Sequence, residues 1–206
     1  DIASSVNSVV LNNFEENLTA ALENKTCFLM VGTVEPRKGH AYALDAMEEL
    51  WRDNADVCLV IVGGQGWKTE ALAHRIEAHP ENNRRLFWLR HVDDQVLVTL
   101  YQSCTCLLMS SWGEGFGLPL IEAARYQLPI IARKLPVFVE ICGAHATYFD
   151  GESPSALAGE IRSWLLRQEN HDNPCSSKIP WLTWQESALQ LCQQLSNLNR
   201  RKNDVA

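Results

Sequence analysis

Short apolar runs alternate with longer amphipathic stretches along most of the chain, and this alternation limits the possible folds more than any other feature. The apolar runs predict strands at residues 27–31, 57–62, 86–89, 106–109, 129–132 and 147–149. The other stretches predict helices at residues 40–52, 69–79, 93–103, 118–126, 137–142, 154–167 and 183–199. Runs that are apolar throughout are typical of strands covered on both faces. The sequence therefore predicts an α/β fold with a doubly wound parallel sheet.

Size and composition exclude several classes of protein. The chain has 206 residues, which suits one domain with trailing elements. Its net charge of −7 disfavours nucleic-acid binding, which needs a basic face. No apolar run approaches the roughly 18–20 residues of a membrane span. The seven cysteines are scattered, odd in number and without metal-ligand spacing, so we expect reduced thiols in a cytosolic protein and no zinc site.

The segment 114–122 combines two carboxylates with a glycine-rich turn. Glu114 precedes the turn, and Glu122 lies in the expected helix that follows it. Gly115 and Gly117 allow the backbone of the turn to approach a ligand closely. The N–H groups of a helix start favour phosphate, while carboxylates accept hydrogen bonds from hydroxyl groups. The segment therefore predicts a site for a phosphate flanked by hydroxylated rings, as in a nucleotide sugar.

A second loop, residues 32–39, follows the first expected strand and carries two adjacent cations. Arg37 and Lys38 precede a helix, whose amino-terminal dipole also attracts anions, so the pair predicts a diphosphate site. Ligands of open parallel sheets bind where strands end, and five loops lie there: 32–38, 63–67, 90–93, 110–117 and 133–136. The sequence has no D-x-D pattern and no P-loop, so we expect neither a protein-held metal ion nor another cofactor.

Other interpretations of these residues stay open. Two carboxylates also suit a glycosidase, but both would come from one contiguous segment, which fits recognition of hydroxyl groups better than catalysis from opposite faces of a sugar. Trp112 and Phe116 flank the segment and can either contact a ligand or pack in the core. Trp67 follows the glycines of the 63–67 loop and is expected to be a lid or core residue.

These residues resemble the carboxyl-terminal domain of glycosyltransferase family 4, whose members have the GT-B fold of two Rossmann-like halves. Residues 114–122 resemble the family's E-x7-E motif, and residues 31–39, VGTVEPRKG, resemble a loop of its bacterial mannosyltransferase-like members. Further matches lie in residues 63–67, 92–101, 136–143 and 184–188. The resemblance therefore covers nearly the whole chain, from about residue 25 to residue 195.

The resemblance implies a role for each matched residue. Glu122 would hold the nucleotide ribose and Glu114 the donor sugar, while Arg37 and Lys38 would neutralise the diphosphate as it leaves. Catalytic roles are thus expected for Glu114, Arg37 and Lys38. Donor binding is expected from these and from Gly32, Thr33, Val92, Gly115, Phe116, Gly117, Leu118 and Glu122. Thr33 and Arg133 depart from the family, because many members carry Arg at the first position and relatives often carry Ser at the second.

The resemblance also divides the chain. Residues 1–24 are expected to be an amino-terminal lead-in or interdomain segment, 25–167 the nucleotide-sugar-binding domain, 168–199 a linker and closing helix, and 200–206 a tail. The first residues contain no initiator Met and no signal-peptide pattern, so we expect a fragment of a longer protein. An expected partner is the amino-terminal, acceptor-binding domain of that parent, without which the fragment should be inactive.

The function that the resemblance implies is that of the donor-binding domain of a retaining, metal-independent hexosyltransferase. It would transfer mannose from GDP-mannose to a saccharide or lipid-linked saccharide in bacterial surface polysaccharide synthesis. The expected location is the cytoplasm, with the parent protein also able to bind peripherally at the inner membrane. The alternatives are a UDP-sugar donor, an inactive nucleotide-sugar-binding module, and a phosphorylase or epimerase of related fold.

Overall fold

A single parallel sheet forms the centre of the molecule. The computed structural model describes residues 15–203, and the side chains of residues 15–196. Within this part of the chain the strands are β1 (Thr26–Val31), β2 (Val57–Val62), β3 (Leu86–Leu89), β4 (Cys106–Met109), β5 (Ile130–Arg133) and β6 (Thr147–Phe149). Their order is β3-β2-β1-β4-β5-β6, and every pair is parallel. The predicted doubly wound parallel sheet is confirmed.

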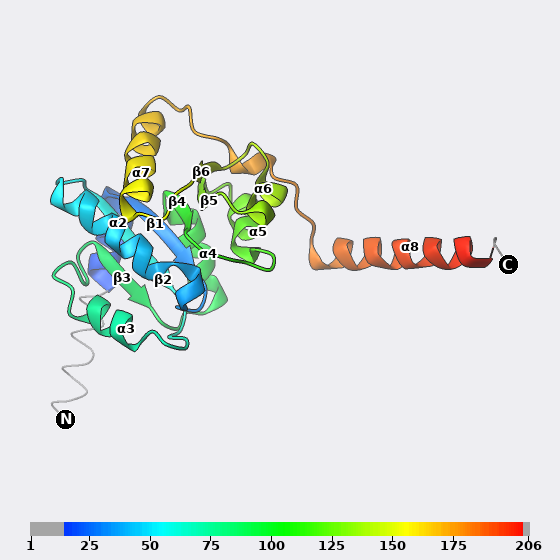
Figure 1. The fold of residues 1–206 in the computed structure, drawn as a ribbon, viewed down its shortest axis with the longest axis horizontal. Coiled ribbons are helices and arrows are strands. Elements are labelled where there is room, and N and C mark those ends of the chain that lie inside the picture. Colours follow the sequence, from blue (N-terminus) through cyan, green and yellow to red (C-terminus); the bar gives the residue numbers. More distant parts are fainter. Residues whose placement is uncertain (1–14, 204–206) are drawn as a thin grey trace.

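Helices cover both faces of the sheet (Figure 1). One face carries α2 (His40–Arg52), α3 (Glu70–Glu77) and α7 (Pro154–Glu169). The other carries α4 (Asp94–Ser103), α5 (Leu118–Arg125), α6 (Pro136–Cys142) and the helical residues 15–24. The crossovers that follow β1 and β4 therefore lie on opposite faces, as a doubly wound sheet requires.

Alternate residues of each central strand enter two separate cores. In β2, Val57, Leu59 and Ile61 belong to the core under α2 and α7, whereas Cys58, Val60 and Val62 belong to the core under α4 and α5. All six of these residues are buried. Because both faces of the strand are covered, neither set of positions needs a polar side chain, which explains why the run is apolar throughout.

Most helix and strand bounds differ from the expected ones by no more than two residues. The exception is the helix expected at 183–199, because α8 continues to Asn203 and so includes the first residues of the expected tail. The helix expected at 69–79 is shorter by one residue at its start and two at its end, because α3 ends at Glu77. Pro80 disfavours helical backbone at the residue before it. His79 instead lies in a turn, where its Nδ1 accepts a hydrogen bond of 3.0 Å from the Glu81 N–H.

The segment between α7 and α8 (Trp184–Asn203) is not a simple extended linker. It contains the short helix η2 (Ser176–Lys178), which contacts α5, and it buries Ser176 and Ile179. Beyond it, α8 projects away from the rest of the molecule (Figure 1). Its side chains from residue 184 to residue 196 are exposed, Trp184 to 81%.

Parts of two predicted segments cannot be compared with the structure. Residues 1–14 of the lead-in and residues 204–206 of the tail lie outside the described residues. The remainder of the lead-in, residues 15–24, is helical and buries Leu18 and Ala21 in the core under α4. No helix in the described part of the chain is long and apolar enough to cross a membrane.

Candidate functional site

Two loops meet at the carboxyl end of the sheet, because β1 and β4 are neighbours there. Gly39 has a left-handed φ of 73°, and a Cβ atom added to it would lie 2.4 Å from the Ser110 carbonyl oxygen. The Trp112 N–H donates a hydrogen bond of 2.7 Å to the Arg37 carbonyl. The loop after β1 and the loop after β4 are therefore packed backbone to backbone, as expected from their shared sheet edge.

The Glu114 carboxylate is the centre of this meeting point. One oxygen accepts hydrogen bonds from Lys38 Nζ at 2.5 Å and Ser111 Oγ at 2.9 Å, and the other accepts from Arg37 Nη1 at 2.9 Å. Only 6% of the Glu114 side chain is exposed. Burial alone would raise the pKa of Glu114, but the hydrogen bonds from Lys38, Ser111 and Arg37 outweigh it and lower the pKa. Glu114 is thus an ionised carboxylate that holds two cations.

Arg37 has donors left for a ligand. Its Nε donates to Glu35, and its Nη1 donates to Glu114 and to the Gly113 carbonyl. The hydrogen bond with Glu114 is the main reason that the pKa of Arg37 is raised, so it stays charged. The Nη2 of Arg37 forms none of the hydrogen bonds found among the described residues, and nearly half of the side chain is exposed. A ligand anion can therefore bind Arg37 without displacing Glu114.

Glu122 lies on the opposite side of the same opening. It projects from α5, which begins after Gly117, a residue with a left-handed φ of 96°. The Tyr101 hydroxyl from α4 donates a hydrogen bond of 2.5 Å to Glu122 Oε2. Burial, followed by the nearby Glu122 charge, raises the pKa of Tyr101, so the phenol remains a donor. This donor fixes Glu122 and leaves its other oxygen to accept from a ligand.

Most of the predicted site residues line one cleft of about 380 Å³. The structure brings together eight of them around it: Gly32, Thr33, Arg37, Lys38, Glu114, Gly117, Leu118 and Glu122. Three others do not line it. The Val92 side chain packs against the core under α4. A Cβ atom added to Gly115 would meet no other atom within 4 Å, and Phe116 is 55% exposed. Their proposed contacts with a donor stay predictions.

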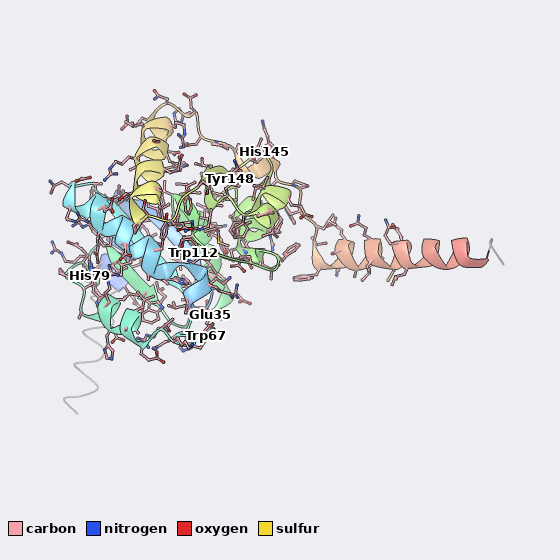
Figure 2. The ribbon with its side chains drawn as sticks, in the orientation of Figure 1. Glu35, Trp67, His79, Trp112, His145 and Tyr148 are labelled. Carbon is pink, nitrogen blue, oxygen red and sulfur yellow. The ribbon has the colours of Figure 1, made fainter. Side chains whose placement is uncertain are left out.

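The aromatic residues near the cleft are exposed rather than packed in the core. Trp67 and Glu35 lie at the same end of the molecule (Figure 2), where the 63–67 loop pairs with Val34. Trp67 and Phe116 are more than half exposed, and Trp112 is 45% exposed. The interpretation of Trp67 and Phe116 as core residues is therefore wrong.

Three supporting residues were not identified as site residues from the sequence. Ser111 and Tyr101 hold the two glutamates, and Arg133 packs beneath Trp112 at 3.7 Å from its ring. Tyr101 lies in a stretch that matches the family, which could have indicated its importance. Ser111 is adjacent to the predicted segment, but nothing in its spacing indicates a partner. In the part of the chain that the structure describes, no three His, Cys, Asp or Glu side chains are arranged to hold a metal ion.

Comparison with known proteins identifies the family of the chain that forms this cleft. Residues 13–178 match the sequence profile described as glycosyl transferases group 1. The chain belongs to this family. The predicted resemblance to glycosyltransferase family 4 is thereby confirmed.

The curated relatives of this glycosyltransferase chain include mannosyltransferases of bacterial O-antigens. It is 47% identical over 195 residues to the serotype-specific mannosyltransferase WbdA of Escherichia coli, covering 95% of this chain and 24% of that protein. It is 27% identical to the O-antigen chain mannosyltransferase RfbU of Salmonella typhimurium, covering 76% of this chain and 43% of RfbU. The chain thus spans about a quarter of the length of WbdA.

Solved glycosyltransferase structures share the fold. Sucrose-phosphate synthase from Thermosynechococcus elongatus matches with a TM-score of 0.69 and 22% identity, over 92% of this chain and 49% of that one. HepE from Anabaena, solved with UDP and glucose, matches with a TM-score of 0.64 and 17% identity, over 79% of this chain and 45% of HepE. In each case the match covers about half of the solved chain, as expected for one half of a GT-B fold.

Proposed function

We propose that this chain is the donor-binding half of a mannosyltransferase that uses GDP-mannose in bacterial surface polysaccharide synthesis. The observation that carries the proposal is the cleft in which Arg37, Lys38 and Glu114 face the loop before Glu122. Two cations, two carboxylates and the start of a helix suit a diphosphate between a ribose and a sugar. Acceptor binding, transfer in the cytoplasm and peripheral association with the inner membrane belong to the longer parent protein.

The pairing of Glu114 with both cations suggests how the donor is bound. The diphosphate would contact Lys38 and the Nη2 of Arg37, adding anionic oxygens to a cluster that already contains the Glu114 carboxylate. Arg37 and Lys38 would then stabilise the charge that develops on the leaving diphosphate, which is the electrostatic part of catalysis. Glu122, held by Tyr101, would accept hydrogen bonds from the ribose hydroxyls.

The choice of mannose is supported by the relatives. WbdA and RfbU are both described as mannosyltransferases, and WbdA matches 95% of this chain. A UDP-sugar is the second candidate donor, since HepE of the same fold was solved with UDP and glucose. We propose that binding needs no metal ion, because Lys38 and the Nη2 of Arg37 can donate charge-assisted hydrogen bonds to the diphosphate.

Calorimetry with the 206-residue chain tests the donor assignment. Titrations with GDP, GDP-mannose, UDP and UDP-glucose, each with and without EDTA, should show tightest binding of GDP-mannose and no effect of the chelator. Arg37→Ala and Lys38→Ala should each weaken binding about tenfold, because each removes a charged contact to the diphosphate. Arg162→Ala removes an exposed arginine of α7 that pairs with Asp53, and is the matched control.

Binding that survives both Arg37→Ala and Lys38→Ala unchanged would contradict the diphosphate assignment.

The inactive-module alternative needs a different assay. Transfer of labelled mannose to an acceptor by the full-length parent would exclude that alternative, whereas tight donor binding without transfer would support it.

A further inference from the structure

Arg133 is a buried cation that pairs with no carboxylate of the described side chains. It is the last residue of β5 and is only 6% exposed. None of the ion pairs formed by the described side chains includes it. Its Nε donates to the Ser110 carbonyl at 3.3 Å and its Nη1 to the Gly151 carbonyl at 2.6 Å, while its buried Nη2 has no hydrogen-bond partner.

Three aromatic rings take the place of a counter-ion. The guanidinium carbon lies 3.7 Å from the centre of the Trp112 ring, 4.6 Å from that of Tyr42 and 4.9 Å from that of Phe149. Tyr42 packs edge-on against Trp112 and stacks on Phe149. Trp112 is far more exposed than Arg133, so its ring shields the guanidinium that it contacts from the solvent. Cation–π contacts of this kind gain strength when the cation is shielded from water.

The contacts of Arg133 lead directly to the cleft. It holds the Ser110 carbonyl and the Trp112 ring, and these residues immediately precede the loop that carries Glu114. The Trp112 N–H in turn donates to the Arg37 carbonyl at 2.7 Å. The Ser110 hydroxyl donates to the Lys38 and Gly39 carbonyls at 3.1 and 3.0 Å. One guanidinium therefore fixes the segment that joins both phosphate-binding cations to Glu114.

We propose that Arg133 is a positioning residue of the donor site, which acts through Trp112 to hold Arg37, Lys38 and Glu114 in register. The proposal rests on the proposed function, because it assigns a role in binding the same donor. A cation buried without a carboxylate costs more free energy than an apolar side chain of the same length would. An apolar side chain could fill this space by packing alone. An arginine in addition places a planar cation on the Trp112 ring and donates hydrogen bonds to two carbonyls, which explains why an arginine occupies this position.

Amide hydrogen exchange in the absence of ligand is the first test. Arg133→Met keeps an unbranched, mostly apolar stem but removes the charge, the planar guanidinium and both of the hydrogen bonds that it donates. It should speed exchange of the Trp112 amide about tenfold or more, because the hydrogen bond to Arg37 loses its support. Arg85→Met is the matched control, since Arg85 also stacks on a Trp, at 5.5 Å from Trp51, on a different part of the fold. Unchanged exchange in Arg133→Met would overturn the proposal.

Donor affinity is the second test. Arg133→Met and Trp112→Ala should each weaken GDP-mannose binding about tenfold, and the double variant should be no weaker than either alone, because both break one path. Arg85→Met should lower the melting temperature and leave the affinity unchanged. Additive losses, or wild-type affinity in Arg133→Met, would overturn the positioning role. If Arg133→Met does not fold, Trp112→Ala tests the same stack from its exposed side.

The two tests separate this proposal from the proposed function. If the wild-type chain binds none of the nucleotide sugars, the donor assignment fails, but the exchange rate at Trp112 still decides whether Arg133 holds the loop. If the wild type binds GDP-mannose and the two variants bind it equally well, the donor assignment stands and the positioning role fails.

Discussion

At the scale of single residues, the site is organised by the pairing of Glu114 with two cations, Arg37 and Lys38. Glu114 accepts from Lys38 and Arg37 in the ligand-free chain, and it is nearly buried. Its low pKa keeps the carboxylate charged at neutral pH. Such a carboxylate orders both cations before the donor arrives, but it also reduces the positive potential that a diphosphate would meet.

Glu114→Gln should therefore affect the nucleotide and the sugar in opposite directions. Removing the negative charge should tighten binding of GDP about three- to tenfold, since Lys38 loses its carboxylate partner and Arg37 keeps only Glu35. It should also remove most of the extra affinity that mannose adds, because the amide accepts sugar hydroxyls less strongly. Calorimetry with GDP and GDP-mannose measures both effects. Glu35→Gln is the control, because Glu35 pairs with Arg37 alone in this cluster. Weaker GDP binding in Glu114→Gln would contradict the prediction.

His40 predicts a pH dependence of stability. It is 2% exposed at the start of α2, and burial, together with the nearby Lys38 charge, lowers its pKa to about 4. The unfolded chain then binds this proton at higher pH than the folded chain does, so the free energy of unfolding falls as the pH drops from about 6.5 towards 4. We expect a loss of about 2 kcal/mol between pH 7 and pH 5.

Urea unfolding at pH 7, 6 and 5 measures this loss. His40→Gln should remove most of the slope, whereas the exposed His74→Gln should retain it. The low pKa of Glu114 contributes only at lower pH, because its stabilisation is lost as the pH falls below the usual carboxyl range. An identical slope in wild type and His40→Gln would show that His40 is not the group responsible.

At the scale of elements, the site exists because two crossovers leave neighbouring strands in opposite directions. β1 and β4 pair in parallel, and their following loops touch through Gly39 and Ser110. The backbones come so close that no side chain fits between them. Because η1 (Pro36–Lys38) lies this close to the end of β4, the Lys38 Nζ comes within hydrogen-bond distance of the Glu114 carboxylate.

Gly39→Ala should disrupt this approach. An alanine Cβ would lie 2.4 Å from the Ser110 oxygen, and the φ of 73° is unfavourable for any side chain. We expect a loss of about 2–4 kcal/mol in the free energy of unfolding, measured by chemical denaturation. Gly159→Ala is the matched control, because Gly159 lies in α7 with nothing within 4 Å of the added atom. That substitution should stabilise the chain by about 0.5–1 kcal/mol. A loss of the same size in both variants would contradict the explanation.

Sequence patterns predicted the elements well and the contacts between them less well. Runs such as Val57–Val62 are apolar at every position because two cores use alternate residues, so they are unmistakable as strands. Arg37 and Glu114 were expected at one site because both follow strands. The aromatic surroundings of Arg133 were not predictable, since Tyr42, Trp112 and Phe149 come from three distant segments. Ile179 was missed because a single buried residue in a polar segment produces no periodicity.

At the scale of the whole molecule, the described chain consists of a two-core domain and a helix that stands apart from it. Figure 1 shows α8 standing clear of the domain, and the large apolar side chains described in it, Trp184, Leu189, Leu191 and Leu195, are all more than half exposed. Both cores are composed of residues that precede α8 in the sequence. The stability of the domain should therefore not depend on this helix.

A chain that ends at residue 183 tests this independence. Removing α8 should change the melting temperature by less than about 2 °C, because every side chain described in this helix is exposed. A chain that ends at residue 175 removes Ser176 and Ile179 as well, and should melt several degrees lower. Differential scanning calorimetry compares the two. Equal melting temperatures for the two truncations would mean that the contact of η2 with α5 contributes nothing.

The central position of β1 has a consequence for how the chain is made. β1 pairs with β2 on one side and with β4 on the other, and the two partners are separated by β3 and two helices in the sequence. During synthesis, β1, β2 and β3 can associate early, but the second edge of β1 stays unpaired until β4 has left the ribosome. An apolar strand with a free edge is prone to pair with other chains. The interval between the synthesis of β3 and that of β4 is therefore when a nascent-chain chaperone would protect this protein most.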